Sequence, residues 1–186
     1  MPGYRINVKN CQRAAVTVNN DTTYTLGTVT AMPTLRSVDV SFKSASGELY
    51  GDGDLVSNRT KLTGATLKLD IDKLTLDDKA FFYGSTKTNK GTLPIATTDT
   101  PTKCAIYFEM EHDDGGYEAV WLLCGQAEPV NITGQQAESN INYSTESINI
   151  NFVRREKDKM LLVMADTDDE GFTTTNQTAF KAGPDI

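Results

Sequence analysis

The residues that could bind a metal ion or act in catalysis lie in a few short acidic stretches. The stretch EMEHDDGG combines one imidazole with several carboxylates, a mixture that divalent metal ions accept as ligands. His112 is the only histidine of the chain, so a zinc site built from several histidines is impossible, and the three cysteines have no paired spacing to replace them. Asp-Asp-Gly-Gly is typical of a turn. We therefore interpret this stretch as a solvated hairpin tip without a metal: Glu109, Glu111, His112, Asp113 and Asp114.

The stretch DTDDEG, residues 166–171, matches the first half of a calcium-binding EF-hand loop. Acids stand at loop positions 1, 3 and 5 and glycine at position 6, as that loop requires. Position 12, where a glutamate should close the calcium shell, is Gln177. The following segment FTTTNQTAF is predicted to be extended rather than helical. We therefore predict an acidic turn here and no calcium site.

Phosphate binding and hydrolysis are weakly supported as well. GDG, residues 51–53, lacks the Lys-Ser/Thr pair and the following helix of a phosphate-binding loop. A serine or cysteine nucleophile would have to recruit the one histidine, and the chain holds no G-x-S-x-G elbow. Asp70 and Asp72 resemble a glycosidase carboxylate pair, but alternate residues of a strand equally form a solvated face. We predict no catalytic, cofactor-binding or metal-binding residues and no enzymatic activity.

Composition favours one β domain over residues 1–186. The chain has 38% hydrophobic residues and a net charge of −7, so it can bury a core, and its surface should repel a nucleic-acid backbone. The opening residues MPGYRINVKN contain no apolar signal core, and no apolar run is long enough for a membrane helix. Three cysteines without an export signal favour reduced thiols.

Hydrophobic residues alternate with polar ones in much of the chain. In RSVDVSFK, residues 36–43, Val38, Val40 and Phe42 share one face, and GATLKLDID, residues 64–72, repeats the alternation. A period of two is typical of strands with one buried and one solvated face. We therefore predict a mainly β fold.

One short helix and a second pair of strands are predicted further along. Thr75 is a candidate N-cap and Gly84 a C-terminal stop, so residues 76–83 are predicted to be helical. KCAIYFEME and YEAVWLLCGQ form a predicted hairpin, and the second strand is apolar on both faces, which is typical of a strand between two layers or at a subunit contact. SNINYSTESINI, residues 139–150, is a further predicted strand.

The order of these blocks resembles that of major tail proteins of long-tailed bacteriophages. The similar blocks are ELYGDGDLVSNRTKLTGATLKLDIDKLTLDDKAFFYG, then YEAVWLLCGQAEP and INYSTESINI, which together run from about residue 36 to residue 152. The resemblance implies a β-sandwich-like or barrel-like tail-tube domain. It further implies a structural virion protein that forms hexameric rings stacked into a hollow tube for DNA delivery.

The resemblance also implies partners and a location. The partners would be other copies of the chain and other tail proteins such as the tape measure and the tail terminator. DNA would pass through the tube without specific binding, and no membrane would be involved. The protein would reside in the host cytoplasm before assembly and in the virion tail afterwards.

On this interpretation the segment at about 43–60 is a hairpin arm that reaches a neighbouring subunit or the adjacent ring. Its apolar anchors would be Leu49, Tyr50, Leu55 and Val56. Its charged rim would be Glu48, Asp52, Asp54 and Arg59. The polar strand faces would line the channel with Asp39, Lys68, Asp70, Asp72 and Glu146.

Three other interpretations remain open. The arm could be a flexible loop without a partner. The domain could be a surface or fimbria-like binding module, which its Thr-rich β composition permits. Less favoured is a small carbohydrate-active enzyme, which would need paired carboxylates about 5 to 9.5 Å apart in a cleft.

Overall fold

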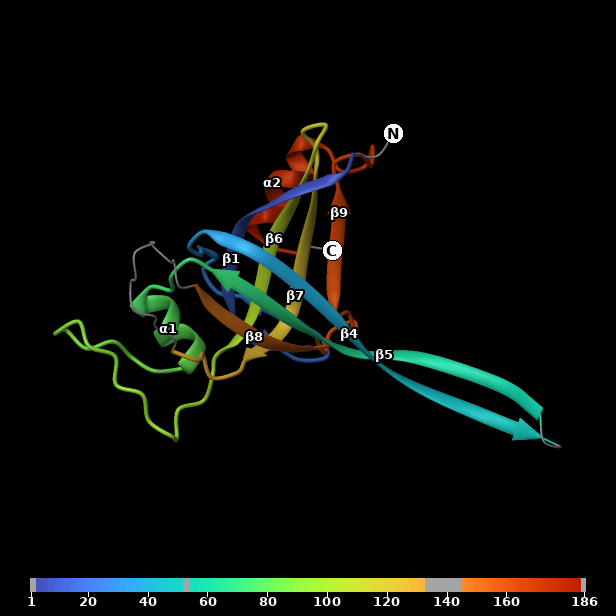
Figure 1. Ribbon diagram of the computed structural model, residues 1–186, viewed down its shortest axis with the longest axis horizontal. Helices are drawn as coiled ribbons and strands as arrows, with labels where there is room; N and C mark the ends of the chain where they lie inside the picture. Colours follow the sequence, from blue (N-terminus) through green and yellow to red (C-terminus); the bar gives the residue numbers. More distant parts are fainter. Residues whose placement is uncertain (1–2, 52–53, 133–144, 185–186) are drawn as a thin grey trace, which may run out of the picture.

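The computed structural model describes residues 3–51, 54–132 and 145–184. The described chain is mainly β, with strands of very different lengths (Figure 1). The strands are β1 Arg5–Asn19, β2 Tyr24–Leu26, β3 Thr30–Ala31, β4 Leu35–Gly51, β5 Asp54–Ile71, β6 Lys103–His112, β7 Tyr117–Ala127, β8 Glu146–Val153 and β9 Leu162–Asp166. The helices are α1 Leu76–Tyr83 and α2 Thr174–Ala182.

The strands form one open antiparallel sheet in the order β2-β1-β6-β7-β8-β5-β4. β6 pairs along the length of β7, so the other edge of β7 is shared by two strands. β9 pairs with residues 118–122 of β7, and β8 pairs with residues 124–127. The sheet therefore divides at β7 into one branch that ends at β9 and another that continues through β8 and β5 to β4. The mainly β fold predicted from the sequence is confirmed.

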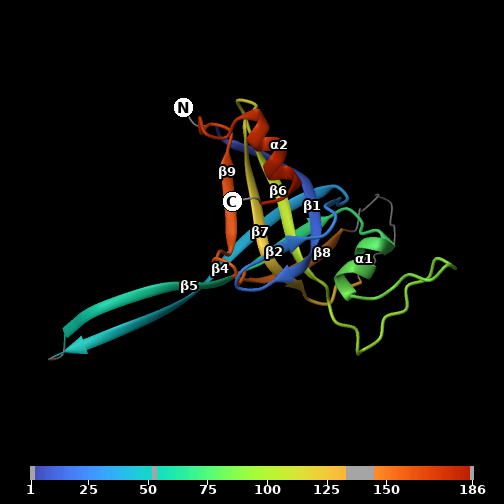
Figure 2. The same cartoon turned by 180° about the vertical axis from the view of Figure 1, so that it is seen from behind.

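The β6–β7 hairpin is buried on both faces, as its apolar sequence predicts. Ile106 and Leu122 pack into the larger core with the apolar faces of β5 and β8. Tyr107 and Trp121 face the other way and pack with Phe180 of α2. Figure 2 shows α2 in front of these strands. β7 thus lies between two layers, which was one of the two environments predicted for it.

Helix α1 has the predicted bounds and caps. The Thr75 hydroxyl accepts from the Asp78 backbone amide, and the Asp78 carboxylate accepts from the Thr75 amide, which satisfies two free donors of the first turn. Gly84 ends the helix in the left-handed region at φ 69°. Phe82 is 1% exposed and anchors the helix in the larger core.

Helix α2 corrects the prediction of one helix and of an extended C-terminal segment. Thr173 caps it by accepting from the Asn176 amide, and Phe180 packs edge-on against Tyr107 and Phe172. The segment is rich in Thr and Asn, which are weak helix formers, so intrinsic propensity favoured a strand. Packing of one aromatic side chain on the sheet outweighs that propensity.

The arm predicted at 43–60 is a two-stranded ribbon made by the outer halves of β4 and β5. Their pairing continues from Ser44 opposite Leu62 to Gly51 opposite Asp54. The ribbon projects from the body of the molecule (Figure 1). The predicted strand at 139–150 is described only from residue 145, and β8 begins at Glu146; the rest of that prediction lies outside the described residues. No helix in the described ranges has the length and apolar character needed to span a membrane.

Candidate functional site

The arm exposes four large apolar side chains. Leu49, Tyr50, Leu55 and Val56 are 61%, 62%, 51% and 64% exposed. The Tyr50 hydroxyl donates to the Glu48 carboxylate at 2.7 Å, and this hydrogen bond raises the pKa of Tyr50. Such a concentration of exposed apolar groups on a ribbon without a covering layer is unusual in a monomer. It is suited to contact with another protein surface.

The charged residues predicted to rim the arm lie on the same two strands as these apolar groups. Glu48, Asp54 and Arg59 are exposed. Glu48 lies opposite Asn58 and Asp54 lies opposite Gly51, so the acids stand near the tip of the ribbon. Asp52 lies outside the described residues. The structure thus places the described members of this set on one projecting element, and their partner remains a prediction.

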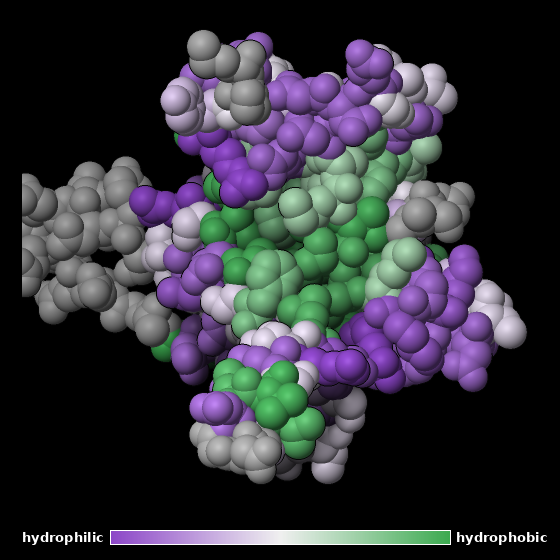
Figure 3. All heavy atoms as spheres, turned by 90° about the vertical axis from the view of Figure 1, so that its right-hand side faces the viewer, coloured by the Kyte–Doolittle hydropathy of each residue, from purple (hydrophilic) through white to green (hydrophobic). Residues whose placement is uncertain are grey.

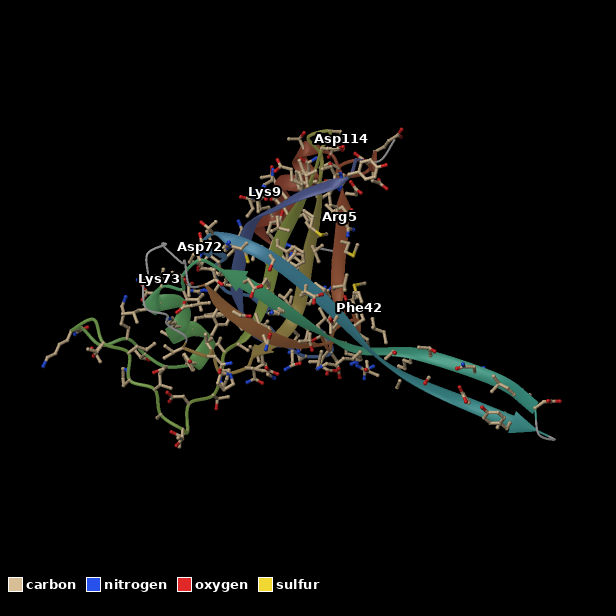
Figure 4. All side chains as sticks on the ribbon, viewed as in Figure 1. Arg5, Lys9, Phe42, Asp72, Lys73 and Asp114 are labelled. Atoms are coloured by element: carbon tan, nitrogen blue, oxygen red, sulfur yellow. The ribbon has the colours of Figure 1, made fainter. Side chains whose placement is uncertain are left out.

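The inner half of β4 forms one wall of an apolar groove. Val38, Val40 and Phe42 line it from β4, and Leu162 and Met164 line it from β9. The groove has a volume of about 280 Å³, and Phe42 and Met164 are 55% and 56% exposed. Figure 3 shows apolar side chains gathered at the centre of this side of the molecule, with polar ones along its margins. Figure 4 places Phe42 where β4 leaves the body.

Both strands that border the groove are unpaired on their outer sides. Among the described residues β4 pairs only with β5, and β9 pairs only with β7. Their free backbone donors and acceptors can accept a further strand. Cover differs along this face of the β4–β5 pair, because Leu67 and Leu69 of β5 are 0% exposed whereas Phe42 of β4, on the same face, is 55% exposed. This open groove between two edges was not predicted, since alternation in β4 indicated an apolar face but not that it lacks a covering layer.

Four of the five residues predicted to line a channel lie on the solvated side of the β4–β5 pair or at its end. Asp39 lies opposite Lys68, and Asp70 follows on the same face of β5. Asp72 is 55% exposed just beyond β5. The Ser37 hydroxyl donates to Asp70 at 2.8 Å and, as the largest cause, lowers the pKa of that carboxyl.

Glu146 does not belong to this face. It lies opposite Ile71 on the buried side of β8, and it accepts hydrogen bonds from the Leu74 amide and the Lys79 ammonium at 2.6 and 2.5 Å. Its function is to hold the start of α1 against the sheet. Glu146 is in phase with Ile148 and Ile150 of β8, so alternation itself places it on the buried face, apart from the other four residues predicted to line a channel.

The polar face carries both signs of charge. Lys68 lies 4.0 Å from Asp70, and Arg36 lies 3.8 Å from Asp72. Lys43 donates to Asn151 on the neighbouring β8. This face therefore combines cations, carboxylates and amides.

The acidic stretch around His112 is partly buried, which corrects the prediction of a solvated tip. Glu109 and His112 are 2% and 3% exposed, whereas Asp113 and Asp114 are exposed. Glu109 accepts from the Tyr107 hydroxyl at 2.8 Å and from Lys181 of α2 at 2.9 Å. The N-terminal strand and α2 cover this end of the hairpin, and sequence alone does not show that they do.

The three cysteines offer no activated nucleophile. Cys11, Cys104 and Cys124 are buried free thiols. Burial raises the pKa of Cys11 and of Cys104 to about 12, so both stay protonated near neutral pH. The reduced state predicted for the cysteines corresponds to the three free thiols of the structure.

Comparison with known proteins gives only distant structural similarity. No protein-family model matches the chain, and no curated protein matches it. A chain of a solved extracellular contractile injection system, the PVC sheath–tube complex in its extended state, is similar with a TM-score of 0.46 and 15% sequence identity. The match covers 87% of this chain and 92% of that chain. Similarity at this level assigns neither a family nor a function, so the resemblance to major tail proteins stays a prediction from sequence.

Proposed function

We propose that this chain is the structural subunit of a phage-type tail tube. Copies of it form hexameric rings, and the rings stack into a hollow tube through which DNA is delivered. On this proposal residues 1–186 act as one tail-tube domain without enzymatic activity or cofactors. The protein resides in the host cytoplasm before assembly and in the virion tail afterwards.

The observation that carries this proposal is the projecting arm with its exposed apolar side chains. A two-stranded ribbon is marginally stable by itself, and its apolar groups gain free energy only when another surface covers them. Burial contributes about 25 cal/mol per Å² of apolar surface, so several large side chains supply a substantial part of a subunit contact. The charged rim of Glu48, Asp54 and Arg59 then restricts how the arm can dock.

The apolar groove and the two free strand edges support self-assembly independently of the arm. A neighbouring copy that adds its strands to β4 or β9 satisfies the unpaired backbone groups and covers Phe42 and Met164. Repetition of one such contact around an axis closes a ring. Closure also removes the free edges that make a β-sheet protein prone to aggregation.

The solvated face of the β4–β5 pair lines the channel in this proposal. Asp39, Lys68, Asp70 and Asp72 are held among hydroxyl and amide side chains, which keep the surface hydrated. Because cations and carboxylates alternate there, DNA meets no continuous positive track to which it could adhere. The other partners are tail proteins such as the tape measure and the tail terminator, and no membrane takes part.

Negative-stain microscopy of concentrated purified protein tests the proposal. Six-membered rings or long tubes are the expected result. The double variant Leu49→Ser/Val56→Ser should remain folded and fail to form tubes, because both side chains are exposed in the free chain. Ile95→Ser is a matched control, since Ile95 is 50% exposed but lies outside the arm.

Two outcomes would contradict the proposal. Uniform small particles from the unaltered chain at every concentration would exclude a tube-forming subunit. Tubes that the double variant forms as efficiently as the control would exclude the arm from assembly. Specific glycan binding by the small particles would instead favour the binding-module interpretation.

A further inference from the structure

Two loops far apart in the sequence meet at the end of the β6–β7 hairpin. The turn after β6 carries His112 and Asp114, and the loop after β9 carries Asp168. One possible ligand atom from each of these residues lies within 4.8 Å of the other two. Reciprocal hydrogen bonds between Tyr117 and Thr167, at 2.8 and 3.1 Å, hold the two loops together. The grouping is therefore fixed by strand pairing at its base.

His112 has an unexplained nitrogen in this group. The residue is 3% exposed, and within the described ranges its Nδ1 atom has no hydrogen-bond partner. Its Nε2 atom lies 3.4 Å from the Glu118 carboxylate. Because the two ring nitrogens point in diverging directions, Nδ1 is directed away from Glu118. Buried polar atoms nearly always have a partner, so a missing one indicates an absent ion or water.

Asp114 and Asp168 each bring a carboxylate oxygen within 4.8 Å of a ring nitrogen of His112. A Cβ atom built on Gly116 would lie 3.3 Å from Asp114 Oδ1 and 3.4 Å from Asp168 Oδ1, so both oxygens converge over this glycine. In the part of the chain that is described, neither carboxylate forms an ion pair with a lysine or arginine. Figure 4 shows Asp114 at the end of the molecule remote from the arm.

A second grouping nearby, His112 with Glu118 and Asp166, is a poorer cation site. Arg5 already neutralises Glu118 through two hydrogen bonds, at 3.0 and 2.5 Å. The Glu118 carboxylate, held by Arg5, also lies 3.4 Å from Nε2 of His112 and fixes that side of the imidazole ring. Histidines that bind metals usually donate their other ring N–H to such a group, which fixes the ring and leaves the opposite nitrogen free to coordinate.

We propose that His112 Nδ1 and the carboxylates of Asp114 and Asp168 bind one divalent zinc ion, with water completing the coordination. Zinc bonds of about 2.0–2.2 Å place ligand atoms no more than about 4.4 Å apart, close to the separations within this group. A nitrogen ligand favours zinc over calcium or magnesium, which prefer oxygen alone. The acidic stretch DTDDEG contributes only Asp168 to the site, so it is not the calcium loop whose first half it matches.

The ion would cross-link the β6–β7 turn to the loop that leads into α2. The start of β1 is attached to the same turn, because Tyr4 donates its amide to Asp113 at 2.8 Å. If zinc binds only the folded chain, the free energy of unfolding rises with the logarithm of the free zinc concentration. The site is remote from the arm, so it is independent of the tail-tube proposal.

Calorimetry and thermal denaturation of the full chain, first stripped with a chelator, test this site with zinc chloride as the probe. We expect saturable binding of one zinc ion per chain and a rise in Tm that calcium and magnesium do not reproduce. Asp114→Asn/Asp168→Asn should weaken zinc binding at least about tenfold. Both side chains are exposed, so this variant should fold without zinc as the unaltered chain does. Glu170→Gln removes one charge from the same loop and should leave the affinity unchanged.

Three results would overturn the proposal. The first is the absence of a one-to-one zinc-binding event in the unaltered chain. The second is equal zinc affinity of the unaltered chain and the double asparagine variant. The third is a loss of affinity in Glu170→Gln as large as in the double variant, which would indicate general attraction to an acidic loop rather than coordination.

Discussion

At the scale of single residues, the buried ion pair between Arg13 and Asp78 connects the sheet to α1. The Arg13 Nε atom donates to Asp78 at 2.8 Å, and the two side chains are 11% and 4% exposed. The guanidinium also lies over the Phe81 ring, 4.2 Å from its centre. Asp78 additionally completes the capping box of the helix. One carboxylate thus serves both the helix start and a buried cation.

Removal of this carboxylate should be strongly destabilising. We expect Asp78→Ala to lower the free energy of unfolding by about 3–5 kcal/mol, because it leaves a buried guanidinium without its partner. Asp77→Ala is the control, since Asp77 occupies the same first turn but is 65% exposed. That change should cost about 1 kcal/mol or less. Urea denaturation measures the free energy of unfolding of both variants. Similar losses in the two would show that the buried ion pair contributes no more to stability than the exposed Asp77 does.

Arg155 and Asp158 form a second residue-scale contact with a pH signature. Arg155 is 2% exposed and donates to Asp158 Oδ1 at 2.7 Å, and this hydrogen bond is the main reason that the pKa of Asp158 falls from 3.8 to about 2. Because the folded carboxyl has the lower pKa, its contribution is complete above the unfolded value of 3.8 and is lost as the pH falls towards about 2. Asp158→Asn should flatten that part of a stability–pH profile; an unchanged profile would contradict this account.

At the scale of elements, Phe180 is the buried apolar side chain that attaches α2 to the sheet. Phe180 is 9% exposed, and its carbonyl accepts from Trp121 Nε1 at 2.7 Å. We expect Phe180→Ala to lower the free energy of unfolding by about 3–5 kcal/mol, as for other aromatic truncations in a core. Trp121 is the only tryptophan, so its fluorescence should shift to the red if α2 detaches. Thr178→Ala, at an exposed position of the same helix, should change stability by no more than about 0.5 kcal/mol.

The two helices show what sequence can and cannot predict at this scale. α1 could be predicted from the sequence, because Thr75, the acids of the first turn and Gly84 are local signals that do not depend on contacts with distant residues. α2 has a capping residue as well, but its helical state depends on contacts with Tyr107 and Trp121, which lie far away in the sequence. The burial of Glu109 and His112 could not be predicted for the same reason. β1 and α2, which are distant in the sequence, cover these residues.

At the scale of the whole molecule, period-two alternation predicted the sheet but not the open groove between β4 and β9. The buried face of β5 and the doubly buried β7 follow from their sequences. The groove does not, because the same alternation in β4 is compatible with a covered or an open face, and only the position of β9 relative to β4 decides which. The hairpin at 43–60 was predicted, since glycines between two alternating strands are visible in the sequence; that it contacts another subunit stays a prediction.

The groove gives the prediction that tests assembly without altering the arm. Phe42 is 55% exposed at its wall, so Phe42→Asp removes apolar surface that the free chain does not bury. We expect the monomer to lose no more than about 1 kcal/mol of stability. In an assembled ring the same aspartate would lie uncompensated in an apolar contact, which costs enough to prevent association.

The measurement is sedimentation velocity combined with microscopy across a range of concentrations. Phe42→Asp should stay a folded monomer under conditions in which the unaltered chain forms rings, and Ile95→Asp, an equal change of charge at an exposed position outside the groove, should assemble normally. If both aspartate variants assemble, the groove is not part of the contact and the free edge of β4 must be satisfied in another way. If both fail, net charge rather than the groove governs association, because the chain already carries a charge of −7.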